Sequence, residues 1–503
     1  MIYVHVPFCR SFCTYCGFYS EICSRMETQQ VQNRLFEDYA EALCAEIDSR
    51  REEISAISGE PVAPAAGSRT ASDPSHASVG PSLSRAEGGT SLQQEPPASY
   101  SGWRPRVCAI QNPKNDSTVP FSPDTLYIGG GTPSVLPLVI LERIVHALGP
   151  VTYEEFTIEV NPDDVVAGGS EYVAGLRALG VNRVSMGVQS FDDGILRWMN
   201  RRHDAAGARE AFRLLRAGGF DNVSIDLIFG LSQLTEAVWE STIKEALALG
   251  PEHISAYQLS IEEDSALERM VADGRYMEAS DEQCRGQYDI LCRKLADAGY
   301  VHYEVSNWAR PGREAVHNSA YWRRVPYIGL GPGAHSFSFG FPTPRIPSDM
   351  NEGPLSPVGE QNNAFCSQKG LVSSRNEQNR TFCSWGGVRS WNRQELPRRE
   401  ADGRLVGWRS EREVLSEREA AEETVMLGLR TAAGLPLSTL RAISPAAAVD
   451  ILLSEGALQL VSTPGKSSAN PSTDCEHAYE GLFIRIPEDR FFVSDDIISR
   501  LLP

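Results

Sequence analysis

Three cysteines lie close together near the start of the chain, in the stretch HVPFCRSFCTYCGFYS at residues 5–20. Their spacing is Cys9-x3-Cys13-x2-Cys16. A zinc knuckle needs four ligands, usually two close pairs, and only His5, inside a predicted strand, stands nearby as a fourth. Three thiolates can instead hold a [4Fe-4S] cluster and leave one iron without a protein ligand. The spacing therefore favours an iron–sulfur cluster with an open iron, with zinc as the alternative.

The composition limits where this chemistry takes place. The 503 residues exceed one ordinary domain, and 41% of them are apolar, which is enough for a sizeable core. A net charge of -19 argues against nucleic acid as a partner, because phosphate binding needs clustered lysine and arginine. No apolar run approaches the ~20 residues of a membrane helix, and the start MIYVHVPFCR lacks a secretion pattern. We therefore expect a cytoplasmic protein with no integral membrane segment, in which a tight cysteine cluster indicates metal or redox chemistry.

Three segments lack the apolar periodicity of folded structure. They are rich in proline, serine, glycine, asparagine, glutamine or arginine. Such segments cannot bury enough apolar surface to offset the entropy lost on folding. We predict insertions at 60–120, 348–408 and 462–479.

The rest of the chain before residue 310 alternates short β-branched runs with amphipathic helical patterns. Six such units indicate a parallel sheet with helices outside it. The predicted strands are 2–6, 125–130, 156–160, 183–188, 222–228 and 253–259. The predicted helices are 31–50, 135–148, 170–179, 204–218, 236–249 and 281–299.

Unusual polar or glycine-rich groups fall at or beyond the carboxyl end of each predicted strand. The first strand runs into the cysteines and the second into Gly129, Gly130, Gly131 and Thr132. The later strands carry Glu159, Gln189, Asp226 and Gln258. In parallel α/β folds, ligands and catalytic groups gather at this rim. Because all six strands contribute to it, we expect a barrel-like arrangement and not an open sheet.

At this point the sequence resembles a known superfamily. CRSFCTYC resembles the signature of radical S-adenosylmethionine (SAM) enzymes, in which SAM binds the open iron of the cluster. YIGGGTPS at 127–134 is similar to the glycine motif that approaches the methionine end of SAM. Without the cysteines, this glycine motif would equally indicate a turn before a helix.

The resemblance extends over nearly all of residues 1–340 apart from the first insertion. TIEVNP, NRVSMGVQSF, SIDLIFGL and YIGLGPGAHS are similar to the oxygen-independent coproporphyrinogen oxidase and HemW haem-chaperone family. This resemblance implies a partial (β/α)6 TIM-like barrel with SAM and a [4Fe-4S] cluster as cofactors. It implies SAM contacts from Tyr3, Tyr15, Gly130, Gly131, Thr132, Glu159, Gln189, Arg201 and Asp226. Each residue also has a structural alternative, as an ion pair, a strand-end hydrogen bond or a core aromatic.

Two features separate the branches of this family. The decarboxylase branch carries a fourth nearby cysteine and a long segment before the cluster, whereas Phe18 follows Gly17 here and eight residues precede Cys9. The haem-chaperone branch carries a His-Asn-x-x-Tyr-Trp motif, which this chain has at 317–322. The resemblance makes His317 the predicted haem ligand, with His335 as a second candidate. On residue type alone, His317 would instead cap a loop above buried aromatics.

The resemblance also predicts the organisation and role of the chain. The predicted domains are a barrel at 1–310, a haem-binding linker at 311–347, a low-complexity insertion at 348–408 and a small α+β winged-helix-like unit at 409–503. The predicted function is a haem chaperone that delivers haem to respiratory haemoproteins. The alternative is oxidative decarboxylation of coproporphyrinogen III in porphyrin biosynthesis, which Phe18 and the short start disfavour. The sequence leaves open whether the chain is an enzyme and whether it forms a homodimer.

Overall fold

The computed structural model describes residues 1–17, 19–26, 28–58, 124–263, 265–339, 387–462 and 481–502. The predicted insertion at 60–120 and nearly all of the one at 462–479 lie outside these residues. Phe18 also lies outside them, so the prediction drawn from it stays untested.

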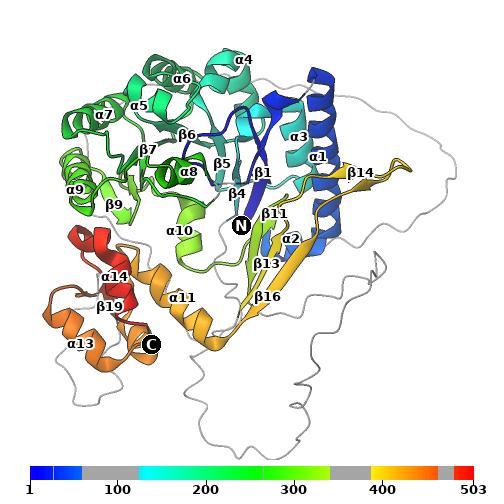
Figure 1. Ribbon diagram of the computed structural model, residues 1–503. Helices are drawn as coiled ribbons and strands as arrows, with labels where there is room; N and C mark the ends of the chain where they lie inside the picture. Colours follow the sequence, from blue (N-terminus) through cyan, green and yellow to red (C-terminus); the bar gives the residue numbers. More distant parts are fainter. Residues whose placement is uncertain are drawn as a thin grey trace, which may run out of the picture.

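A nine-stranded sheet forms the centre of the chain, in the order β11-β1-β4-β5-β6-β7-β8-β10-β9 (Figure 1). The six predicted strands are all present and are parallel neighbours in chain order. They are β1 (Ile2–Val6), β4 (Thr125–Gly130), β5 (Glu155–Val160), β6 (Arg183–Gln189), β7 (Val223–Phe229) and β8 (His253–Gln258). The α/β class with a large parallel sheet is thereby confirmed.

Three further strands complete the edges of this sheet. β11 (Ile328–Leu330) adds a parallel strand beside β1, while β10 (Asn307–Ala309) and β9 (Val301–Glu304) add antiparallel strands beyond β8. No strand pairing joins β11 to β9 in the described part of the chain. β11 and β9 are therefore the two edges of a partial barrel.

Helices cover the outer face of the sheet (Figure 1). They are α1 (Gln29–Ser49), α2 (Arg51–Ser58), α3 (Leu138–Leu148), α4 (Pro162–Ala178), α5 (Asp193–Trp198), α6 (Ala205–Ala217), α7 (Glu236–Leu249) and α9 (Asp281–Asp297). Helix α8 (Ala266–Ala272) instead lies against the loop that carries the cysteines, where the Leu267 N–H donates to the carbonyl of Thr14 at 2.9 Å. Several begin at a side chain that caps the first turn, as Asp204 does for α6 and Ser280 for α9. No described helix combines the length and apolar character that crossing a membrane requires.

The predicted helix at 170–179 is wrong at its start, because α4 begins at Pro162. Proline suits the first helical position, and Asp163 and Asp164 follow it in the first turn. Inside the helix, Gly169 has a φ of 59°, which kinks the chain there. This kink breaks the 3.6-residue apolar pattern, so the sequence signal begins only after the kink.

The two faces of the central strands differ in character. Side chains such as Val4, Ile128 and Ile158 are fully buried in the apolar core beneath the helices. The opposite face carries polar groups that bond between strands, for example Ser224 to His253 at 2.8 Å. The polar groups of the rim project from this inner face.

A second sheet contradicts part of the predicted insertion at 348–408. β12 (His335–Ser338), β13 (Gly387–Asn392) and β16 (Ser410–Leu415) form an antiparallel sheet. The short pair β14 (Arg398–Arg399) and β15 (Leu405–Val406) lies between β13 and β16 in the chain. Residues 387–408 are therefore structured. Their polar composition hid this because their partners lie far away in sequence: Asn392 donates to Glu46 and to the carbonyl of Gly331.

The C-terminal part is a small α+β unit, as predicted. Helix α10 (Val316–Trp322) lies under the barrel, and α11 (Glu417–Leu429) leads into the unit (Figure 1). A three-stranded antiparallel sheet is formed by β17 (Leu435–Pro436), β19 (Leu482–Arg485) and β18 (Gln459–Ser462). The helices α12 (Leu437–Ile443), α13 (Ala446–Ser454) and α14 (Ser494–Ser499) complete it.

Candidate functional site

The cysteine loop is anchored at both ends and at its middle. It leaves the barrel through β2 (Phe8–Cys9), which pairs with β3 (Glu21–Ile22) where the loop returns. At the middle, Thr14 donates from its backbone N–H to the carbonyl of Met199 at 3.1 Å and from its hydroxyl to that of Trp198 at 2.8 Å. These bonds hold the loop against the chain that follows α5, at the carboxyl rim of the sheet.

The three cysteines differ in their surroundings. The Cys9 thiol is buried and shares a hydrogen bond of 3.3 Å with the Thr132 hydroxyl, and burial raises its pKa. The Cys13 thiol accepts a hydrogen bond of 3.3 Å from Arg201, while Cys16 is half-buried. None of the three is in a disulfide. Among the described residues, no three cysteine, histidine or carboxylate groups stand in metal-ligand geometry as placed.

The donor set nonetheless fits an iron–sulfur cluster. Three thiols occur on one anchored loop, and the cationic Arg201 donates to one of them. The same guanidinium donates to Asn161 Oδ1 and to the carbonyl of Gly187, each at 2.6 Å. Burial lowers the pKa of Arg201, but the nearby Tyr15 and Cys13 outweigh this effect and raise it. A partly buried permanent cation thus stands beside the thiols and balances part of the charge of a cluster.

The glycine motif brings β4 against the start of the cysteine loop. Gly130 has a φ of 108°, and a Cβ there would lie 2.6 Å from the His5 ring. A Cβ on Gly131 would lie 2.8 Å from the Phe8 carbonyl, and the Gly131 N–H donates to the carbonyl of Val6 at 2.8 Å. The space beside these glycines is filled by the protein itself. Their predicted contact with SAM stays a prediction.

Two half-buried carboxylates, Glu159 and Asp226, stand on the inner face of the sheet. Glu159 accepts from the Tyr127 hydroxyl at 2.8 Å and from the Gly130 N–H at 3.1 Å, and burial raises its pKa to about 7. Asp226 accepts from the Ser185 hydroxyl at 3.3 Å, and burial raises its pKa too. In the described part of the chain, neither carboxylate has an ion-pair partner within 4.0 Å. Such groups are suited to accept bonds from ribose hydroxyls or from an ammonium group.

Of the remaining predicted SAM residues, Tyr3 lies near the amino end of β1, Tyr15 lies in the cysteine loop and Gln189 ends β6 at the rim. Tyr3 shares a hydrogen bond of 3.0 Å with His5, and its ring lies 6.1 Å from that of Tyr127. Gln189 is buried and has a φ of 66°, at the point where the register between β6 and β7 shifts. A left-handed backbone at a residue other than glycine is often found at functional sites. The structure thus gathers the predicted residues of β1, β4, β5, β6 and β7 on one face.

His317 lies elsewhere, under the barrel on α10. It is 1% exposed, and both ring nitrogens are occupied: Nδ1 by the Thr125 hydroxyl at 2.8 Å and Nε2 by the Tyr321 hydroxyl at 2.9 Å. Burial lowers its pKa to about 3. The Glu155 carboxylate accepts the N–H groups of Val316 and His317, which caps the helix. Ligation of iron by His317 would require one of the ring hydrogen bonds to break.

Comparisons with known proteins bear on the family. The family model described as Radical SAM superfamily matches residues 120–246. The chain is 38% identical over 227 residues to the heme chaperone HemW of Synechocystis, covering 44% of this chain and 54% of that protein. It is 37% identical to HemW of Bacillus subtilis, covering 44% and 59%. These likenesses support a radical SAM, HemN/HemW-like family. The chain spans about half the length of the curated relatives it matches.

Two further proteins are similar to this chain. The coproporphyrinogen III oxidase HemN of Escherichia coli aligns over 99% of this chain and 89% of its own, with a TM-score of 0.58 and 18% identity, so it shows a common fold alone. A zebrafish protein named radical S-adenosyl methionine domain-containing protein 1, mitochondrial, is 35% identical over 42% of this chain and 48% of its own length.

Sequence reasoning missed two polar residues of this site, Tyr127 and Ser185, which hold the two carboxylates. Asn161, which binds Arg201, was recognisable as a polar group at the carboxyl end of a predicted strand. Tyr127 was also recognisable, because strand periodicity places it on the same face as Gly129 two positions later. The role of Ser185 was not, since its partner comes from another strand.

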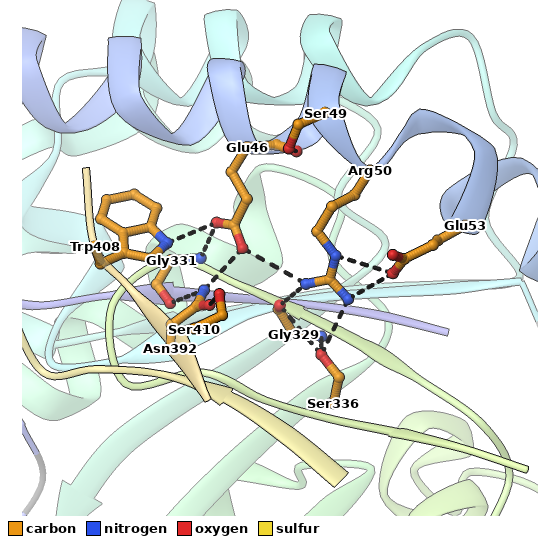
Figure 2. Close-up of polar contacts among 10 residues, drawn as sticks. All are labelled: Glu46, Ser49, Arg50, Glu53, Gly329, Gly331, Ser336, Asn392, Trp408 and Ser410. Carbon is orange, nitrogen blue, oxygen red and sulfur yellow. Dashed lines mark hydrogen bonds and ion pairs between the residues drawn. The ribbon is translucent and has the colours of Figure 1, made fainter. Parts of the chain in front are cut away.

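A buried network outside the barrel was also missed (Figure 2). The Glu46 carboxylate of α1 accepts from the Gly331 N–H at 2.9 Å, from Asn392 at 2.8 Å and from the Trp408 indole at 3.0 Å. The neighbouring Arg50 donates to the carbonyl of Gly329 at 2.8 Å. This Glu46 network ties the loop after β11 to α1 and to the second sheet.

Proposed function

We propose that this radical SAM protein is a haem chaperone. It would bind a [4Fe-4S] cluster through Cys9, Cys13 and Cys16, together with SAM and haem, and deliver haem to respiratory haemoproteins. The observation that carries the proposal is the 36–38% identity to several curated HemW heme chaperones. The anchored loop of three thiols on the polar rim supports it.

The residues of the rim have distinct tasks in this proposal. When bound, the cluster supplies an electron and an iron that carries no thiolate. Arg201 balances negative charge at Cys13 and keeps Asn161 in place. Glu159 and Asp226, half-buried on the inner face, would accept hydrogen bonds from the donors of SAM.

Localisation and partners belong to the same proposal. We place the protein in the cytoplasm, with haem or a porphyrinogen as its small-molecule partner and no nucleic acid. The barrel at 1–310 is the cluster- and SAM-binding domain, and 409–503 is the packing or partner unit. His317 stays the haem ligand predicted from the sequence, with His335 as the second candidate.

A single anaerobic experiment separates the chaperone from the decarboxylase. Reconstituted full-length protein is incubated with haem, and separately with coproporphyrinogen III, SAM and a reductant. We expect stable haem binding and no vinyl-bearing product. Product formation would favour the decarboxylase, and a single zinc ion in place of iron and sulfide would overturn the cluster.

A matched pair of variants tests the ligand assignment in the same protein. Cys16→Ser is expected to lose the iron–sulfide absorption on reconstitution, because only two thiolates remain. Cys23→Ala is the control, since Cys23 is a buried cysteine seven positions later whose thiol donates to the carbonyl of Cys9. Loss of iron in the control alone would contradict the assignment.

A further inference from the structure

The first turn of α4 contacts the cysteine loop through one buried carboxylate. Asp164 Oδ1 lies 3.1 Å from Nε of Arg10, the residue that follows Cys9. The Arg10 side chain is 42% exposed, whereas that of Asp164 is 3% exposed. A carboxylate buried this deeply is costly unless its oxygens are paired. The ion pair therefore joins the start of the cysteine loop to a fixed, buried group of the barrel.

The second oxygen of this carboxylate reaches the glycine motif. Asp164 Oδ2 accepts the Ser134 hydroxyl at 2.8 Å, and both side chains are buried. The Ser134 oxygen in turn accepts the backbone N–H of Asn161 at 3.1 Å. Buried networks in which each member has a partner are rigid. One carboxylate thus fixes the loop after β4 and the residue that follows β5.

Asn161 connects these contacts to two of the predicted cluster thiols. Its side chain donates to the Thr132 hydroxyl at 3.3 Å and accepts from Arg201 at 2.6 Å. Thr132 shares a hydrogen bond of 3.3 Å with the Cys9 thiol. Arg201 donates to the Cys13 thiol, also at 3.3 Å. The polar partners of both thiols therefore meet at the residue that precedes α4.

The neighbouring Asp163 shows which of these contacts are specific to Asp164. The Asp163 carboxylate pairs with Arg202 at 2.7 Å and, among the residues that the structure describes, contacts neither Arg10 nor Ser134. Arg202 also approaches Asp164, but only to 3.8 Å. The two acids carry the same charge in one helical turn, yet only Asp164 contacts both the cysteine loop and the glycine motif.

We propose that Asp164 is a positioning residue for the iron–sulfur cluster. It holds the start of the cysteine loop through Arg10. Through Ser134 and Asn161 it also supports the hydrogen bonds to two of the three thiols. Groups behind metal ligands control how tightly the ligands bind, and charges and hydrogen bonds near a cluster set its reduction potential. The proposal rests on the proposed function, because it requires a cluster on the cysteine loop.

The test is anaerobic reconstitution of the full-length protein and its variants, followed by iron release to a chelator and a redox titration of the cluster absorption. Asp164→Asn keeps the size of the side chain and an acceptor for Ser134, but it loses the charge that pairs with Arg10. We expect this variant to hold iron about 10- to 100-fold more weakly. Its midpoint potential should become more positive, because a negative charge beside the loop is lost.

Three further variants separate positioning from general charge and from misfolding. Asp163→Asn is the matched control, and we expect it to hold iron as the parent protein does, with a smaller shift in potential. Asp164→Glu keeps the charge and should recover most of the iron affinity and the potential. Combining Asp164→Asn with Arg10→Gln should cost no more than the larger of the two single losses, because both changes break the same ion pair.

Each outcome decides the proposal. If Asp164→Asn retains iron within about threefold of the parent protein and keeps its potential, Asp164 has no positioning role and the cluster assignment stands. If Asp163→Asn weakens iron binding equally, the charge of the turn is responsible and the proposal is wrong. If the parent protein assembles no cluster, the proposed function fails, and the role of Asp164 with it.

Discussion

Replacing Glu46 by alanine is expected to release the loop after β11 from α1. The carboxylate is 11% exposed and accepts three N–H groups, from Gly331, Asn392 and Trp408. In the variant, Asn392 keeps its bond to the carbonyl of Gly331, but the Gly331 N–H and the Trp408 indole lose their acceptor. Two buried donors are then left unpaired.

The magnitude follows from these two donors. An unpaired buried donor costs about 1–3 kcal/mol. Burial raises the pKa of Glu46, so removing this carboxylate also relieves a desolvation cost that offsets part of the loss. We expect the local opening free energy to fall by about 2–4 kcal/mol, which corresponds to about 30- to 1,000-fold faster amide exchange.

Hydrogen exchange with mass spectrometry measures this directly in peptides covering residues 328–338. Local exchange is preferable to a global unfolding curve, because a chain of this size need not unfold in one step. Glu37→Ala is the control on the same helix, since Glu37 is exposed and pairs with Arg143 at the surface. Exchange at Gly331 within about threefold of both the parent protein and the control would refute the reasoning.

Three further predictions concern the rim. Arg201→Lys loses the planar fork that reaches three acceptors and should raise the SAM dissociation constant about tenfold or more by calorimetry. Arg202→Lys should not, because Arg202 pairs with Asp163 and Asp164 and not with the thiols. Gly130→Ala should lower the free energy of unfolding by about 1–3 kcal/mol more than Gly169→Ala does, as measured by thermal melting. Both glycines have a positive φ, but only a Cβ on Gly130 meets a ring. Equal losses in the two variants would contradict this. Glu159 has a pKa of about 7 in the folded state, against an ordinary 4.5, so the folded state holds its proton more tightly. The free energy of unfolding should therefore fall by about 3 kcal/mol as the pH rises from below 4.5 to above 7. Urea midpoints at pH 5 and pH 8 check this, and Glu159→Gln should reduce their difference; an unchanged difference would count against the shifted pKa.

Much of the barrel was predictable from the sequence. Each of the six strands is a short β-branched run followed by a helical pattern, and both signals depend on residues close together in the chain. The same locality made the cysteine loop recognisable, because Cys9, Cys13 and Cys16 occur within eight residues. The rim residues followed from the topology, since the carboxyl ends of parallel strands meet at one edge. Local pattern and one topological rule therefore determined the fold and the identity of the site.

The tertiary structure decided what no local pattern contains. The polar stretch at 387–408 folds because Asn392 and Trp408 reach Glu46, more than 340 positions away. His317 and His335 are the same residue type, and only packing buries the former and exposes the latter. Burial and hydrogen-bond partners arise from contacts between distant segments, whose closure depends on the whole fold. For this reason the sequence indicated the chemistry of the site, but only the structure could show which side chains are accessible to a ligand.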